Sequence, residues 1–140
     1  MGIVWDPDLS IGVHEIDLQH QELFRQVDQL LQAMERGKGR EVIAKLLAFL
    51  SQYVAEHFHA EQELMIRHGY PNYRHHKTQH DDFVSGLLEL LDEFERTGPT
   101  ISLTLKVNRL VYPWLRLHIG TFDRAIGEFL GTRRMAQASR

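Results

Sequence analysis

Apolar residues recur every three or four positions along most of this chain, the spacing that places them on one face of an α-helix. This spacing predicts amphipathic helices and not strands. Gly and Pro residues interrupt it near residues 37–39, 69–71 and 98–99, where we expect turns. Long helices joined by short connections favour an all-α fold, an antiparallel up-down-up-down four-helix bundle. Its helices are predicted at residues 18–36, 40–67, 72–96 and 100–122.

Two segments lie outside these helices. Residues 1–17 carry Trp5, Ile11 and Ile16 among polar residues, and we expect them to pack across the bundle as an N-terminal arm. Residues 131–140 are basic, and we expect a flexible tail there. Because 140 residues is a usual length for one domain, we expect residues 1–140 to form a single domain around one core.

Composition argues against several classes of protein. The 16 Lys and Arg residues and 19 Asp and Glu residues give a net charge of −3, which does not predict binding to nucleic acid. The chain has no Cys, so any metal ligands must be nitrogen and oxygen atoms. No apolar stretch approaches the roughly 18 residues of a membrane span, and the first residues do not resemble a signal peptide. We therefore expect a cytoplasmic protein without a membrane span.

Nine histidines stand out in so short a chain, and several of them interrupt the apolar faces. Residues four apart in a helix lie within about 40° of each other, so a polar residue in step with the apolar ones points inward. Each predicted helix has at least one such histidine, and two carboxylates also point inward. The seven inward residues are His20, His57, Glu61, His76, His80, His118 and Asp123. Histidines expected to be exposed, without a metal role, are His14, His59, His68 and His75.

Seven converging polar groups predict a metal site. An unpaired buried polar group costs about 1 to 3 kcal/mol, so five imidazoles and two carboxylates need partners that an apolar core does not offer. The set is too large for one tetrahedral zinc and too rich in nitrogen for calcium or magnesium. Two first-row metals fit if both carboxylates and one solvent oxygen bridge them, which leaves one coordination position vacant for a small ligand. Iron, manganese, cobalt and zinc all remain possible from spacing alone.

The motifs that carry these residues resemble the hemerythrin family, and the length and leader are similar to the single-domain bacteriohemerythrins. Myohemerythrin, a member of that family, is itself a four-helix bundle. The resemblance extends from Trp5 to Asp123. Its motifs are Gly12-Val13-x-x-Ile16-Asp17-x-Gln19-His20, His57-Phe58-x-x-Glu61-x-x-x-Met65, Tyr70-Pro71 with His76-x-x-x-His80, and Trp114-Leu115-x-x-His118-Ile119-x-x-x-Asp123.

The resemblance implies a non-haem di-iron centre with an oxo or hydroxo bridge that binds dioxygen reversibly. By position, three histidines would hold the saturated iron, two the open iron, and the carboxylates would bridge. The histidines of the saturated iron would be His76, His80 and His118, and those of the open iron would be His20 and His57. The bridging carboxylates would be Glu61 and Asp123. Trp114, Leu115 and Ile119 flank His118 and are expected to line the oxygen pocket. No catalytic residue is implied, and the protein is expected to be a carrier, store or delivery protein and not an enzyme.

Two other functions stay open. The same centre could serve a di-iron oxidase, a peroxidase or a nitric-oxide-reactive enzyme, each of which needs a reductant. It could also serve an oxygen or iron sensor, for which an unidentified partner protein would supply the output.

Three local features bear on the site. Gln62 stands where many relatives have Glu, and its position out of step with Glu61 predicts little effect on the site. Pro113 should either kink the fourth helix or begin a new helical piece. The five-residue step from His118 to Asp123 corresponds to about 140° in an α-helix, so Asp123 is expected to need a local irregularity to reach the metals.

Overall fold

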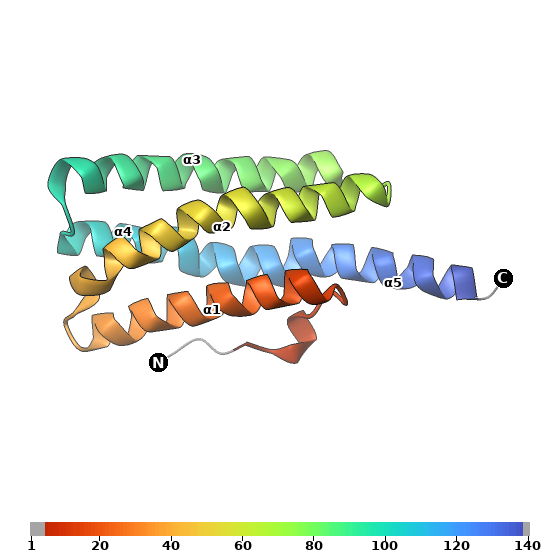
Figure 1. Ribbon diagram of the computed structural model, residues 1–140, viewed down its shortest axis with the longest axis horizontal. Helices are drawn as coiled ribbons and strands as arrows, with labels where there is room; N and C mark the ends of the chain where they lie inside the picture. Colours follow the sequence, from red (N-terminus) through yellow and green to blue (C-terminus); the bar gives the residue numbers. More distant parts are fainter. Residues whose placement is uncertain (1–4, 139–140) are drawn as a thin grey trace.

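The computed structural model describes residues 5–138, with side chains as far as Gly131, and its regular elements there are all helical (Figure 1). The last three elements follow one another without a loop and form one rod, so four antiparallel rods make up the bundle. The prediction of an all-α four-helix bundle is confirmed. The elements are the 3₁₀ turn η1 (Pro7–Leu9), α1 (His14–Glu35), α2 (Gly39–Arg67), α3 (Tyr73–Thr97), α4 (Ile101–Trp114), the π-helix η2 (Leu115–Asp123) and α5 (Arg124–Ala138).

Helices α2 and α3 end close to the predicted positions, but the outer ends of α1 and α5 do not. Helix α1 begins at His14 and not near residue 18, since the Asp17 amide already donates to the Val13 carbonyl. The fourth rod continues to Ala138 and not to residue 122, because Ile126 and Leu130 extend its apolar face into the bundle. Residues 131–138 thus belong to α5, while residues 139–140 lie outside the described residues; flexibility of the tail stays a prediction.

The connection between α3 and α4 shows how local chemistry sets the antiparallel arrangement. Gly98 ends α3 with φ at 74°, a left-handed conformation that glycine adopts without a steric penalty. Two residues later, the Thr100 side chain accepts a hydrogen bond of 3.0 Å from the Leu103 amide and caps α4. The chain therefore reverses within three residues, Gly98, Pro99 and Thr100, and α4 returns beside α3.

Two separate apolar clusters fill the bundle. The larger one lies toward the end of the bundle where the α1–α2 and α3–α4 connections are, and it includes Leu23, Leu50, Phe83 and Leu115. The smaller one consists of Ile11, Ile16, Met65, Ile126 and Leu130. Along three of the rods the inward histidines and carboxylates fall between members of the two clusters. The polar residues therefore form one layer of the core, with apolar layers on both sides.

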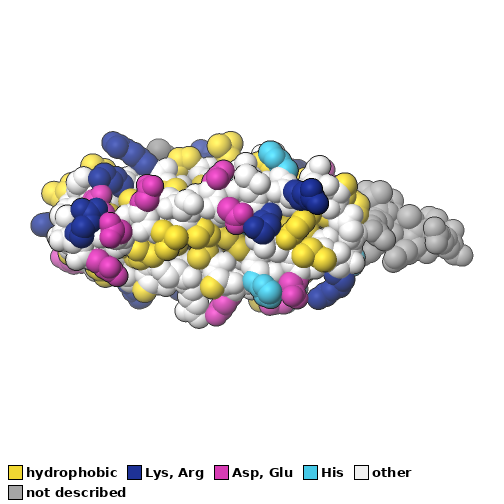
Figure 2. Space-filling model, turned by 90° about the horizontal axis from the view of Figure 1, so that it is seen from above, with side chains coloured by type: hydrophobic (Ala, Val, Ile, Leu, Met, Phe, Trp, Pro, Cys, Tyr) yellow, Lys and Arg dark blue, Asp and Glu magenta, His cyan; other side chains and the backbone are white. Residues whose placement is uncertain are grey.

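The charged side chains on the surface and the polarity of the helices agree with the expectations drawn from the composition. On the face drawn in Figure 2, Lys and Arg side chains are interspersed with Asp and Glu side chains and do not gather into a single basic patch. No helix in the described part of the chain is both long and apolar enough to cross a membrane.

Residues 5–13 run along the outside of the bundle and connect to it at both ends. The Trp5 ring packs edge-on against Phe24, with 5.4 Å between centroids. Ile11 is buried, and its amide donates a hydrogen bond of 2.8 Å to the Asp17 carboxylate. The arm meets the fourth rod at Gly127, where an added Cβ would lie 2.8 Å from the Ile11 Cα. The backbone of the arm thus packs directly against α5 at Gly127.

We predict that Gly127→Ala destabilises the protein by about 1 to 2 kcal/mol, measured by urea unfolding. The overpacking penalty of about 1 to 3 kcal/mol exceeds the gain of up to about 1 kcal/mol that alanine brings to a helix. Gly131→Ala is the matched control, because a Cβ there meets nothing within 4 Å and only the helix gain remains. Equal unfolding free energies for the two variants would contradict the close packing of the arm.

Candidate metal centre

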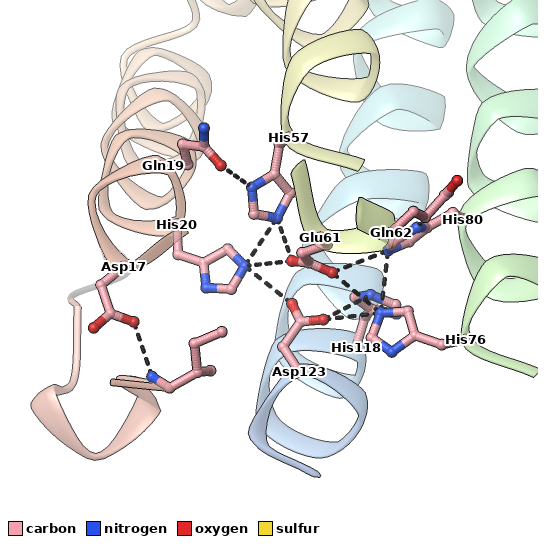
Figure 3. Close-up of polar contacts among 11 residues, drawn as sticks. Asp17, Gln19, His20, His57, Glu61, Gln62, His76, His80, His118 and Asp123 are labelled. Carbon is pink, nitrogen blue, oxygen red and sulfur yellow. Dashed lines mark hydrogen bonds and ion pairs between the residues drawn. The ribbon is translucent and has the colours of Figure 1, made fainter. Parts of the chain in front are cut away.

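The structure brings all seven predicted polar residues together at the middle of the bundle (Figure 3). Each is at most 2% exposed, and all four rods contribute. Their potential ligand atoms fall into two groups, and within each group all of them lie within 4.8 Å of one another. One group consists of His20, His57, Glu61 and Asp123, and the other of Glu61, His76, His80, His118 and Asp123.

Glu61 projects from α2 between the two groups and offers one oxygen to each. Its Oε2 atom lies 2.5 Å from His57 Nε2 and 3.2 Å from His20 Nε2. Its Oε1 atom lies 3.1 Å from His76 Nε2 and 3.2 Å from His80 Nε2. A carboxylate with its oxygens divided in this way has the geometry of a bridging ligand.

Asp123 repeats this division from the fourth rod. Its Oδ2 atom lies 3.0 Å from His20 Nε2, whereas its Oδ1 atom lies 3.1 Å from both His76 Nε2 and His118 Nε2. Both carboxylates therefore span the same two groups, one with two histidines and one with three. This is the division that the ligand count predicts for two metals.

The expected irregularity near Asp123 is present. Residues Leu115–Asp123 form a π-helix, in which the Arg124 amide bonds to the Ile119 carbonyl five residues earlier. Because such bonds bring residues five apart nearly one above the other, His118 and Asp123 face the same side. The extra residue in the turn is what allows both side chains to reach the centre.

Pro113 lies in the last turn of α4, two residues before the π-helix begins, and does not begin a new α-helix. It has no amide hydrogen to donate to the Arg109 carbonyl, so the regular α-helical ladder is interrupted there. The change to π geometry follows within two residues. A proline that interrupts this ladder favours such a change of helix type at this position.

The donor set fits metal ions better than it fits mutual hydrogen bonding. All five histidines direct Nε2 into the same space, where His20 and His57 approach to 3.0 Å and His76 and His80 to 3.1 Å. Several buried atoms nevertheless find no hydrogen-bond partner among the described residues: His118 Nε2, both Asp123 carboxylate oxygens, and Nδ1 of His20, His76 and His118. Each unsatisfied group costs about 1 to 3 kcal/mol, and bound cations at the centre would satisfy the Nε2 and carboxylate atoms together.

Charge balance in the metal-free protein comes from protonated histidines. Burial lowers the pKa of His20, but the adjacent carboxylates of Asp123 and Glu61 outweigh this effect and raise that pKa to about 10. The same opposing effects raise the pKa of His76 to about 9. Although burial acts against ionisation, the surrounding histidines hold the pKa values of Glu61 and Asp123 below their usual range. The centre thus keeps two carboxylates ionised in the core.

Aromatic rings cover the three-histidine group. Trp114 stacks on His118 with 4.2 Å between centroids, and Phe58 stacks on His80 at 3.9 Å. Leu115 and Ile119 are fully buried in the larger apolar cluster. Of these residues, the sequence pattern singles out Trp114, Leu115 and Ile119. Phe58 was missed as a neighbour of the centre, although it follows His57 directly and therefore lies next to it on α2.

Two glutamines also contact the centre. Gln19 Oε1 accepts a hydrogen bond of 2.5 Å from His57 Nδ1. Gln62 Nε2 lies 3.1 Å from His80 Nδ1, so Gln62 contacts a predicted ligand although its position on α2 is out of step with Glu61. Its long side chain reaches across to α3. Periodicity describes where a Cα faces and does not show this reach.

The other histidines stay outside both groups. His14, His59 and His75 are exposed as predicted, and the side chain of His59 is 72% exposed beside Glu63. His68 is partly buried and not exposed, because it lies at the C-terminal end of α2 where the chain turns toward α3. That these four histidines have no metal role stays a prediction.

Tyr53 is a further buried neighbour of the centre. Its ring stacks on His57 at 4.6 Å, and its hydroxyl has no hydrogen-bond partner among the described residues. Burial raises the pKa of Tyr53 well above its usual value, and the charges of Glu61 and Asp123 add to this effect. The ring forms the inner wall of a surface pocket of about 210 Å³, which Gln19 and His57 also line.

We predict that Tyr53→Phe raises the unfolding free energy of the metal-free protein by up to about 1 kcal/mol. The substitution keeps the stacked ring and removes an unsatisfied buried hydroxyl, whose burial costs free energy. Thermal unfolding monitored by circular dichroism measures the change, and Tyr53→Leu provides the contrast because it also removes the stacking. A clear loss of stability in Tyr53→Phe would show that the hydroxyl has a partner.

Comparison with known proteins places the chain in a family. Residues 11–130 match the family model described as the hemerythrin HHE cation binding domain. A bacteriohemerythrin of Stenotrophomonas maltophilia is 33% identical over 129 residues, which cover 90% of this chain and 80% of that protein. One of Methylococcus capsulatus is 32% identical over 123 residues, covering 88% and 92%. With this match over most of its length, the chain belongs to the hemerythrin family.

Proposed function

We propose that this protein binds dioxygen reversibly at a di-iron centre. The observation that carries the proposal is the division of both carboxylates between a three-histidine group and a two-histidine group. Membership of the hemerythrin family and the bacteriohemerythrins among its relatives support iron as the metal and dioxygen as the ligand. In this proposal the metal ligands are His20, His57, Glu61, His76, His80, His118 and Asp123.

The unequal number of histidines favours ligand binding on one side. Glu61 and Asp123 contribute to both groups, so the group with His20 and His57 has one donor fewer than the group with His76, His80 and His118. The missing donor leaves a position for a small molecule. Two ferrous ions held by these residues would supply the two electrons that reversible dioxygen binding requires.

The task of the surrounding residues is to exclude water and to hold the ligands still. Apolar layers lie on both sides of the polar layer, and the seven polar residues are at most 2% exposed. Trp114, Leu115 and Ile119 would line the oxygen pocket from the fourth rod, together with Phe58 from α2. A dry pocket of this kind favours binding without turnover, because it keeps bulk water away from a bound ligand. We therefore propose a carrier, store or delivery protein and not an enzyme.

Repeated oxygenation of the ferrous protein tests the proposal. Reduced protein is exposed to air and then deoxygenated, while the visible charge-transfer band and the dioxygen consumed are followed. We expect the band to appear and disappear over several cycles, with one dioxygen taken up per chain. Consumption of dioxygen in excess of the chains, in the presence of a reductant, would instead indicate an oxidase.

A further inference from the structure

The two glutamines that contact the centre lie in matching places. Gln19 on α1 bonds to Nδ1 of His57, in the two-histidine group, and Gln62 on α2 bonds to Nδ1 of His80, in the three-histidine group (Figure 3). Both contacts lie on the outer edge of an imidazole whose Nε2 atom faces Glu61. Each half of the centre therefore has one histidine held from outside by a neutral amide.

An amide can orient a metal-binding histidine in a way that a carboxylate cannot. An imidazole that binds a metal through Nε2 carries its proton on Nδ1, which then needs an acceptor. The Gln19 oxygen already meets this need at His57. At His80 the Gln62 amide nitrogen faces Nδ1, so it can donate a hydrogen bond to the tautomer whose proton is on Nε2. In that tautomer the Nε2 proton faces Glu61 Oε1, which lies 3.2 Å from Nε2. Turning the amide over would suit the metal-bound tautomer, so Gln62 can pair with His80 in both states.

The neutrality of these partners affects the charge of the centre. Glu61 and Asp123 are the only carboxylates in the two groups of ligand atoms, so they supply two negative charges against the four positive charges of two ferrous ions. A glutamate in place of either glutamine would draw the Nδ1 proton toward itself and make the imidazole more electron-donating. A more electron-donating imidazole stabilises the oxidised metal. Reversible oxygen binding requires instead that the reduced metal stays accessible, because the iron pair must regain its electrons when oxygen leaves.

We propose that Gln19 and Gln62 are positioning residues that orient His57 and His80 as neutral partners and thereby keep the reduction potential of the iron pair high. The inference rests on the proposed function, since it assumes that the two groups hold iron. It assigns to these amides a role in reversibility that is separate from the role of the metal ligands.

The test compares Gln62→Glu, Gln19→Glu and Gln62→Met with wild type. Gln29→Glu is the matched control, because it adds the same charge at an exposed position on α1. Midpoint potentials are measured by redox titration of the iron protein without dioxygen. Zinc affinity is measured by chelator competition, and the tautomer of His80 is measured by ¹⁵N NMR on the metal-free protein. None of these readouts depends on oxygen binding.

We expect each Glu variant to shift the oxidation equilibrium about tenfold toward the ferric state, which for one electron is 59 mV. Gln62→Met is expected to weaken zinc binding by about 10-fold to 100-fold and to change the His80 tautomer distribution. Gln29→Glu should match wild type. Potentials of Gln62→Glu and Gln19→Glu equal to that of Gln29→Glu, with unchanged zinc affinity in Gln62→Met, would overturn the inference. A wild-type protein that holds two metals but fails to bind dioxygen would contradict only the proposed function.

Discussion

Replacing Glu61 with Ala is expected to prevent assembly of the two-metal centre. Glu61 is the only side chain on α2 with an oxygen toward each group, so its loss removes a donor from both metals at once. It also leaves the protonated histidines of the metal-free core without one of their two anionic partners, which costs about 3 to 5 kcal/mol for a buried ion pair. Iron per chain by mass spectrometry and unfolding by urea measure the two effects.

Two further variants separate chemistry from packing. Glu61→Gln keeps the volume of the side chain and should still bind fewer than two irons per chain, because a neutral amide bridges metals poorly. His59→Ala lies two residues away on α2, but its side chain is 72% exposed and points away from the centre. It should match wild type in iron content and stability. Full iron loading in either Glu61 variant would remove Glu61 from the ligand set.

Removing the iron is expected to produce the second large effect. Metals that bind the folded state alone stabilise it by mass action, by about 4 kcal/mol when the free metal is a thousand times its Kd. For a domain of this size the corresponding fall in Tm is on the order of 10 °C. Scanning calorimetry of iron-loaded and chelator-treated protein measures this fall, and restoring iron should reverse it.

The direction of this effect follows from the layered core. Without metals, the polar layer retains unsatisfied atoms of His118 and Asp123 between two apolar clusters. The apolar clusters do not depend on metal, so we expect the metal-free protein to stay folded but to melt earlier. Identical melting with and without iron would mean that the metals do not bind within this layer.

Most of the fold and the centre could be predicted from the sequence because one rule governs both. The 3.6-residue period assigns an inward face to each helix, and the histidines and carboxylates of the centre occupy that face in step with Leu and Phe. His57 and Glu61 illustrate the rule, since the same spacing places His59 and Glu63 outside. Buried polar groups then identify a site, because an apolar core cannot satisfy them.

The features that the sequence did not reveal have local causes. The period indicates an irregularity between His118 and Asp123, but it does not specify a π-helix that begins at Leu115, two residues after Pro113. The contacts of Gln19 and Gln62 depend on long side chains that reach a neighbouring rod. The continuation of the fourth rod depends on packing of Ile126 against the arm residue Ile11. The glutamine contacts and the packing against the arm join different elements, which periodicity within one element does not describe.

The most direct test of the central claim is a crystal structure of the iron-loaded protein with anomalous scattering recorded at the iron edge. We predict two anomalous peaks per chain, one among Glu61, His76, His80, His118 and Asp123, and one among His20, His57, Glu61 and Asp123. Both carboxylates should contact both peaks. A single peak, or a second peak outside these residues, would contradict a di-iron centre held by this set of ligands.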